Sequence, residues 1–189
     1  MGRWEPDSQG RLQEAALALY SERGFDQTPV AQIAARAGLT ERTFFRHFAD
    51  KREVLFAGSE VLRERILAGV KGAPAGVGPL DAVALGLDAA AAMLGAFRRD
   101  LARQRQSVIA ANPELREREL SKLAAYASGV RDALHGRGVG EPRATLAAEA
   151  GMTVLRVALE RWAWAEEECD LTTVMRDCVA GLREVATGV

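Results

Sequence analysis

The segment GFDQTPVAQIAARAGLTERTFFRHFADK, residues 24–51, decides the fold of this chain. Its Thr28 and Pro29 form a typical helix start, a hydroxyl that can cap the helix followed by a proline at the first helical position. Apolar side chains then share one face over residues 30–37, and Gly38 ends the helix. The spacing therefore predicts a short helix that stops at a glycine turn.

A second short helix, residues 41–48, is predicted directly after this turn. Phe44 and Phe48 are four residues apart, so they share a face and can anchor the helix from behind. The other side chains are left on the outer and lateral faces: Thr40, Glu41, Arg42, Thr43, Phe45, Arg46 and His47. Small residues such as Ala34 and Ala37 allow the two helices to cross steeply. This arrangement is a helix-turn-helix, whose second helix enters the major groove of DNA.

Helical periodicity continues along the rest of the chain, and no segment alternates with the period of a β-strand. One helix, which Ser8 or Asp7 can cap and Gly24 can end, is predicted before the helix-turn-helix. The later helices are predicted over residues 50–70, 80–94, 101–111, 120–134, 141–168 and 171–185. The chain is therefore predicted to be all-α, with about nine helices.

The charge of the chain is nearly balanced overall but positive around the predicted helix-turn-helix. The 189 residues carry a formal net charge of −1, which argues against a histone-like protein that coats nucleic acid by bulk charge. Between Arg36 and Arg52, five cations accompany two anions, so this segment has a net charge of +3. The local excess is compatible with a DNA-binding site.

Composition limits the other function classes. No apolar run approaches the roughly 20 residues of a membrane span, and the first residues lack the apolar region of a secretory signal. The two cysteines and two histidines cannot form a four-ligand zinc site alone. Paired carboxylates beside a histidine, metal-ligand spacings and a phosphate loop are not found. We expect a reduced, cytoplasmic protein without metal, cofactor or enzymatic activity; a helical enzyme or ligand carrier is the weaker alternative.

Residues 8 to about 57 resemble the DNA-binding domain of the tetracycline-repressor (TetR) family of bacterial regulators. The resemblance rests on a long pattern with matching spacing: Gly24-Phe25, Thr28, Ile33-Ala34, Ala37-Gly38-Leu39, Thr43-Phe44-Phe45-Arg46-His47-Phe48, Asp50-Lys51 and Leu55. The remaining two thirds of the chain match the family only in length and helical character. The resemblance implies a three-helix DNA-binding domain, residues 1–57, and a C-terminal helical bundle for effector binding and dimerisation, residues 58–189.

The resemblance also implies which side chains contact DNA. Phosphate contacts fall on Thr43, Phe45, His47 and Lys51. Phe45 departs from the tyrosine that the family often has, and loses a hydrogen bond worth on the order of 1 kcal/mol. Arg42 is the best candidate for base readout, because a guanidinium can bridge O6 and N7 of guanine. The full predicted set is Thr28, Gln32, Thr40, Glu41, Arg42, Thr43, Phe45, Arg46, His47 and Lys51.

Several of these contacts have two interpretations. Arg46 could read a base or bind phosphate, and Glu41 could accept from cytosine or orient its arginine neighbour. Thr40 is either a helix cap or a phosphate donor. Thr28 and Gln32 could touch the DNA backbone or a flanking base.

The last two predicted helices, 141–168 and 171–185, are apolar on two faces, which indicates burial on two sides. One face can line the core and the other a second subunit; burial of both faces in a monomer is the alternative. The resemblance implies that two such helices from each chain form a four-helix bundle. The predicted interface residues are Val154, Val157, Arg161, Val174, Cys178 and Leu182. The pattern leaves open which stripe faces the partner.

Members of the family usually hold a small effector inside the C-terminal domain. Methionine and aromatic side chains adapt to apolar ligands, so the candidates for lining a pocket, which could instead be plain core, are Met93, Phe97, Tyr126, Met152 and Trp162. We expect a homodimeric repressor that a largely apolar effector releases from a palindromic operator in double-stranded DNA, with the helix over residues 50–70 as the lever. A DNA-binding regulator without a small effector is the alternative.

Overall fold

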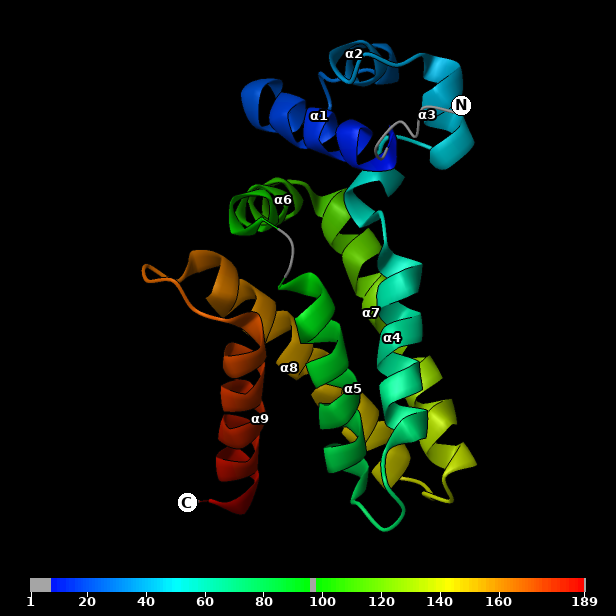
Figure 1. Ribbon diagram of the computed structural model, residues 1–189, viewed down its shortest axis with the longest axis vertical. Helices are drawn as coiled ribbons and strands as arrows, with labels where there is room; N and C mark the ends of the chain where they lie inside the picture. The colour runs from blue at the N-terminus through cyan, green and yellow to red at the C-terminus, as the bar shows by residue number, and fades with distance from the viewer. Residues whose placement is uncertain (1–7, 96–97, 189) are drawn as a thin grey trace, which may run out of the picture. The chain divides into compact units, whose positions relative to one another are not determined.

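The computed structural model describes residues 8–95 and 98–188 of the chain (Figure 1). These residues form nine α-helices and one 3-10 helix, η1, which confirms the predicted all-α fold. In chain order the elements are α1 (Ser8–Arg23), α2 (Val30–Arg36), α3 (Glu41–His47), η1 (Glu53–Phe56), α4 (Ser59–Gly72), α5 (Pro79–Leu94), α6 (Arg99–Ala111), α7 (Pro113–Gly136), α8 (Arg143–Trp164) and α9 (Leu171–Thr187). Among the described residues, no single helix is long and apolar enough to cross a membrane. The bent pair α5 and α6, taken together, reaches the required length and apolar composition.

The chain packs into two compact units. Residues 8–58 pack with residues 101–119, and the described residues between 59 and 100 pack with residues 120–188. The first unit thus contains α1, α2, α3 and η1 together with most of α6 and the start of α7. The return of residues 101–119 to the first unit has no counterpart in the sequence prediction. A division of functions at residue 57 stays a prediction.

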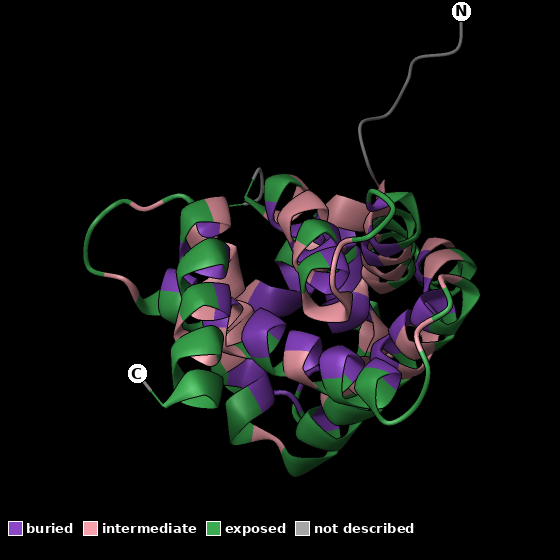
Figure 2. Ribbon diagram, turned by 90° about the horizontal axis from the view of Figure 1, so that it is seen from below, coloured by how far each residue is buried: buried purple, intermediate pink, exposed green. Residues whose placement is uncertain are grey.

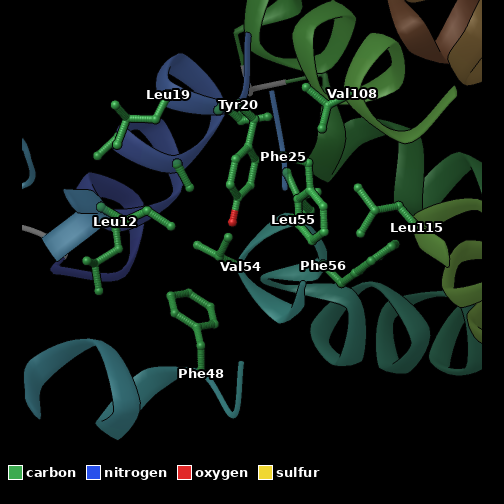
Figure 3. Packing of buried hydrophobic residues seen from close by; sticks show 14 of the residues in the cluster. Leu12, Leu19, Tyr20, Phe25, Phe48, Val54, Leu55, Phe56, Val108 and Leu115 are labelled. Carbon is green, nitrogen blue, oxygen red and sulfur yellow. The ribbon is translucent and has the colours of Figure 1, made fainter. Parts of the chain in front are cut away.

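The first unit is held together by a hydrophobic core to which nearly all its elements contribute (Figure 3). Its buried side chains include Leu12, Leu19, Tyr20, Phe25, Phe48, Val54, Leu55, Phe56, Val108 and Leu115. The rings of Tyr20 and Phe25 meet edge to face, with their centroids 5.0 Å apart. Aromatic packing therefore fixes the turn between α1 and α2 against the core.

The two predicted glycine turns lie where the sequence indicates them. Gly24 follows α1 with a φ of 86°, and Gly38 follows α2 with a φ of 67°. Glycine adopts this left-handed conformation without steric cost. A Cβ at Gly38 would also lie 2.9 Å from Nη2 of Arg11. The turn between α2 and α3 therefore requires glycine.

The predicted helix over residues 50–70 is wrong as a single element, because the chain breaks it at residues 57 and 58. Asp50 caps only the short η1: its Oδ1 accepts the N–H groups of Arg52 at 2.8 Å and Glu53 at 3.1 Å. Gly58 then adopts a φ of 77°, which interrupts helical geometry before α4 begins. The spacing of apolar residues alone fits both arrangements, so it did not reveal the break.

Two other helix ends also differ from the sequence prediction. α7 begins at Pro113 rather than near residue 120, because proline is well tolerated in the first turn of a helix. α8 ends at Trp164, short of the predicted residue 168. The next helix, α9, begins where the side chain of Asp170 accepts the N–H of Thr173 at 3.0 Å.

In the second unit, α5 packs against α4, α8 and α9. The helices carry their buried residues on the inner side and exposed residues on the outer side (Figure 2). α4 and α5 approach closely at Gly69 and Gly86, since a Cβ on Gly86 would lie 2.6 Å from the carbonyl oxygen of Ile66. Glycines thus set the spacing of the central helix pair.

Candidate nucleic-acid interface

Two buried aromatic side chains anchor α3 to the core of the first unit, as the sequence predicts. Phe44 is fully buried, Phe48 is 5% exposed, and their ring centroids lie 5.4 Å apart. Thr40 caps the helix: its Oγ1 accepts the N–H of Thr43 at 3.2 Å and lies 3.0 Å from the Thr43 hydroxyl. The helix is therefore fixed at its start and along its inner side.

The outer face of α3 carries two arginines and an aromatic ring. Glu41, Arg42, Phe45 and Arg46 are exposed, and Phe45 keeps 54% of its surface accessible. The Phe45 ring contacts Phe44 edge to face, with centroids 5.5 Å apart. In the part of the chain that the structure describes, Arg42 forms no hydrogen bond or ion pair, so its guanidinium is available and Glu41 does not orient it.

His47 connects the end of α3 to the first residue of α1. Its Nε2 lies 2.7 Å from the hydroxyl of Ser8, and Nη2 of Arg46 approaches the same nitrogen at 3.5 Å. Ser8 was singled out in the sequence as a helix cap, whereas Asp7, the other candidate, lies outside the described residues. The half-buried imidazole is thus held in place by α1.

The end of α1 holds two side chains of α2 through hydrogen bonds that the sequence analysis missed. Arg36 donates to both carboxylate oxygens of Glu22, at 2.6 and 2.8 Å, and this hydrogen bonding lowers the pKa of Glu22. Arg23 donates from Nη1 to Oε1 of Gln32 at 2.9 Å. These pairs are nine and fourteen residues apart in sequence and lie on different helices, so no local pattern indicates them.

The predicted DNA contact by the side chain of Thr28 is wrong. Thr28 is fully buried, and its hydroxyl donates to the carbonyl oxygen of Gly24 at 2.8 Å. The carbonyl oxygen of Leu19 lies 3.5 Å from the same hydroxyl. Pro29, not Thr28, is the cap residue of α2. A buried hydroxyl needs a hydrogen-bond partner, and the end of α1 supplies one, so Thr28 stabilises the turn instead of facing solvent.

The half-buried side chain of Lys51 turns toward the α1–α2 turn, and its phosphate contact stays a prediction. Its Nζ lies 2.9, 3.2 and 3.5 Å from the carbonyl oxygens of Phe25, Asp26 and Thr28, and 4.3 Å from the centre of the Phe25 ring. The hydroxyl of Tyr20 donates to the Lys51 carbonyl oxygen at 2.7 Å. Burial raises the pKa of Tyr20, and the charge of Asp50 adds to this shift. An ammonium has three N–H donors, and here all three have acceptors within the chain.

We therefore expect Lys51→Met to destabilise the first unit more than it weakens phosphate binding. Methionine keeps an apolar side chain beside Phe25 but removes the ammonium that donates to the carbonyl oxygens of the α1–α2 turn. The free energy of unfolding should fall by about 1–2 kcal/mol, measured by urea denaturation. The salt dependence of DNA binding should stay unchanged. If stability is unchanged and the salt slope of DNA binding falls by about one counterion per subunit, Lys51 contacts a phosphate instead.

Of the predicted pocket residues, Trp162 lines a hollow of the second unit. Tyr126, Met152 and Trp162 are buried, Met93 is half-buried, and Phe97 lies outside the described residues. The Tyr126 hydroxyl donates to the carbonyl oxygen of Ser59 at 2.7 Å. Trp162 borders a hollow of about 400 Å³ whose other lining residues are Gly95, Arg99, Glu168, Cys169, Asp170 and Leu171. Its charged residues differ from the apolar lining expected from sequence.

The predicted dimer residues separate into two groups on α8 and α9. Val154 and Val174 are buried within the chain, at 4% and 8% exposure, so these two predictions are wrong for a partner-facing surface. Val157, Cys178 and Leu182 are half-buried and Arg161 is exposed. We call these last four residues the α8–α9 outer face. Nη1 of Arg161 donates to Sγ of Cys178 at 3.5 Å, so the two helices meet at this face.

Comparisons with known proteins agree with this geometry. Residues 12–57 match the family described as bacterial regulatory proteins, tetR family, and residues 77–187 match the MftR C-terminal domain. The HTH-type transcriptional regulator TcmR of Streptomyces glaucescens is 40% identical over 95 residues, which are 50% of this chain and 38% of TcmR. The chain thus spans well under half the length of that relative.

Two solved structures of transcriptional regulators share the fold over nearly the whole chain. One, from Pseudomonas aeruginosa, has a TM-score of 0.64 at 19% identity and covers 98% of this chain and 94% of its own. Another is FadR of Bacillus subtilis in complex with stearoyl-CoA, with a TM-score of 0.59 at 18% identity. The match covers 92% of this chain and 96% of the FadR chain.

The anchored helix-turn-helix and the separate helical unit define a DNA-binding transcriptional regulator. With family matches in both its N-terminal and C-terminal parts, the chain belongs to the TetR family of bacterial transcriptional regulators.

Proposed function

We propose that the protein is a cytoplasmic, homodimeric repressor that inserts α3 of each subunit into the major groove of a palindromic operator. The observation that carries this proposal is the outer face of α3, where Arg42 and Arg46 are exposed while Phe44 is fully buried. A recognition helix needs free donors in front and a rigid support behind. Both requirements are met on one seven-residue helix.

The exposed side chains of α3 fall into two groups, one suited to base readout and one suited to contacts with the DNA backbone. Arg42 follows the cap at the start of the helix, where a recognition helix meets base edges, and its donors suit guanine. Thr43, Arg46 and His47 can donate to phosphates, which fix register rather than sequence. Phe45, an aromatic side chain that water disfavours, would pack on the sugar-phosphate backbone. Thr40 acts through its cap.

Selection of bound duplexes from a random library tests this function. One helix buries too little surface for strong specificity, and two-fold symmetry supplies a second half-site about one DNA turn away. Wild-type protein should enrich a palindrome with half-sites roughly 10 base pairs apart. Recovery of unrelated sequences, or of a single unrepeated site, would contradict the proposal.

The α8–α9 outer face is proposed as the dimer interface. It is partly apolar and lies on the side of these helices that is not buried against α5. Exposed apolar residues extend it: Leu146 at 65%, Trp164 at 53% and Val185 at 83% exposure. An apolar surface that continues along two helices is typical of an interaction site. Burial of Val154 and Ala158 of α8 and of Val174 of α9 within the chain supports the choice of the outer face for the partner.

We expect Val157→Glu to convert the wild-type dimer to a monomer. A carboxylate in the centre of an apolar interface would lose its hydration without gaining a partner. Molar mass measured by light scattering should fall from two chains to one. Leu120→Glu, which changes an equally apolar and 62% exposed residue of α7 outside this face, is the control and should stay dimeric. A wild-type monomer, or a Val157→Glu dimer, would contradict the assignment.

A small, largely apolar effector is proposed to release the DNA. FadR of Bacillus subtilis, which shares the fold, holds stearoyl-CoA. An effector can act only if it binds the conformation that misfits the operator more tightly. A panel of acyl-CoA thioesters and other apolar compounds should contain one that raises the melting temperature and lowers operator affinity. A compound that raises the melting temperature without releasing DNA would not be the effector.

A further inference from the structure

The amide of Gln32 is held in one orientation by Arg23. Gln32 lies in the first turn of α2 and is exposed, and Arg23 is the last residue of α1. Nη1 of Arg23 lies 2.9 Å from Oε1 of Gln32. A guanidinium can donate hydrogen bonds but cannot accept them, so the atom facing it must be the amide oxygen. The amide nitrogen of Gln32 therefore points away from Arg23, with both of its N–H groups.

The neighbouring pair, Arg36 and Glu22, differs from Arg23 and Gln32 in that the α2 side chain is the donor. Arg36 is one helical turn further along α2 and is also held by the end of α1, through two hydrogen bonds to Glu22. Its charge is thereby paired, and its donors are turned toward a carboxylate. Within residues 8–95 and 98–188, the N–H groups of the Gln32 side-chain amide have no acceptor. The end of α1 thus occupies the donors of Arg36 and leaves those of Gln32 available.

We propose that Arg23 is a positioning residue that makes Gln32 a donor to hydrogen-bond acceptors of DNA; this inference rests on the proposed DNA-binding function. A free glutamine reads adenine with both amide atoms, oxygen to N6 and nitrogen to N7. With its oxygen turned toward Arg23, Gln32 presents its two amide N–H donors on the side away from α1. The acceptors that fit are a phosphate oxygen, N7 of guanine or adenine, guanine O6 and thymine O4. Adenine readout by both amide atoms is disfavoured.

The experiment measures affinity for the selected duplex by fluorescence anisotropy over a range of salt concentrations. Arg23→Met, which removes the donor but keeps an unbranched side chain, should weaken binding about three- to tenfold. The slope of log affinity against log salt should not change, because no phosphate contact by a cation is lost. Arg23→Lys should restore most of the affinity. Arg176→Met, which removes an arginine paired with Asp88 in the second unit, controls for loss of one charge.

A double-mutant cycle with Gln32 separates positioning from direct charge. In the Gln32→Ala background, Arg23→Met should cause no further loss of affinity, because the group that it positions is absent. Gln32→Glu keeps the contact to Arg23 as an ion pair but replaces the donors with an oxygen. It should weaken binding more than about tenfold while circular dichroism and thermal melting stay as in wild type.

The same variants also identify the acceptor. If Gln32→Ala weakens all duplexes alike, the acceptor is a phosphate; if it relaxes the preference at one base pair in each half-site, the acceptor is an atom of that base pair. Both results support the proposal. It is overturned if Arg23→Met flattens the salt slope by about one ion per subunit in both backgrounds, or if neither residue affects affinity while wild type still binds. A wild-type protein that binds no duplex would overturn the proposed function itself.

Discussion

Phe44→Ala is expected to lower the free energy of unfolding by about 3–5 kcal/mol and to abolish specific DNA binding. Phe44 is fully buried and contacts the rings of both Phe45 and Phe48, at centroid distances of 5.5 and 5.4 Å. Its removal leaves a cavity beneath α3, a helix of seven residues that cannot persist without tertiary support. Urea unfolding followed by circular dichroism measures the change in stability, and anisotropy measures the loss of binding.

Phe45→Ala is the matched control for this prediction, since it removes the same side chain from the exposed side of the same helix. Phe45 is 54% exposed, so its replacement should change stability by less than about 1 kcal/mol. DNA affinity should nevertheless fall, because Phe45 belongs to the proposed contact face. If Phe44→Ala were as mild as Phe45→Ala, α3 would not depend on the aromatic anchor.

Arg42→Ala is expected to remove most sequence preference while leaving non-specific binding nearly intact. A bidentate contact to guanine discriminates by about 1–3 kcal/mol, and a dimer on a palindrome makes two such contacts. Specific affinity should therefore fall about thirtyfold or more, whereas binding to unrelated DNA, which depends on phosphate contacts, should change little.

Arg42→Lys separates geometry from charge. Lysine keeps the positive charge but cannot reproduce the planar pair of donors of a guanidinium. We expect Arg42→Lys to resemble Arg42→Ala in sequence preference and wild type in the salt dependence of binding. A lysine variant that selects the wild-type palindrome would show that Arg42 contributes only charge.

The helix-turn-helix could be predicted because its signals are local. Thr40 caps α3 through a hydrogen bond three residues away, and Gly38 adopts the left-handed conformation that ends α2. Phe44 and Phe48 share a face because of helical spacing alone. Each of these features depends on residues within one or two turns, so the sequence carries them directly.

The hydrogen-bond partners of two candidate DNA-contact residues lie far away in the sequence. Thr28 and Lys51 both look like surface donors in the sequence, yet both donate to carbonyl groups of the α1–α2 turn. Lys51 reaches oxygen atoms 26 residues away along the chain. The Arg23 contact to Gln32 was missed for the same reason. A motif gives the position of such residues in the sequence, but only the packed structure gives the acceptors that they face.

The two apolar stripes of α8 illustrate the same limit in the second unit. Both stripes have helical periodicity, and sequence gives no preference between them. Packing against α5 and α9 buries residues of both stripes, such as Val154 and Trp162, and leaves Val157 partly accessible. The choice between core and interface therefore depends on the neighbouring helices rather than on the stripe itself.

Substitution of single guanines in the selected operator by 7-deazaguanine tests the central claim, major-groove readout by α3, most directly. This base pairs normally with cytosine but lacks the N7 acceptor in the major groove. At one position in each half-site, the substitution should weaken wild-type binding about tenfold or more and should leave the remaining affinity of Arg42→Ala unchanged. The account is contradicted if no 7-deazaguanine weakens the wild type, or if the same substitution weakens Arg42→Ala equally.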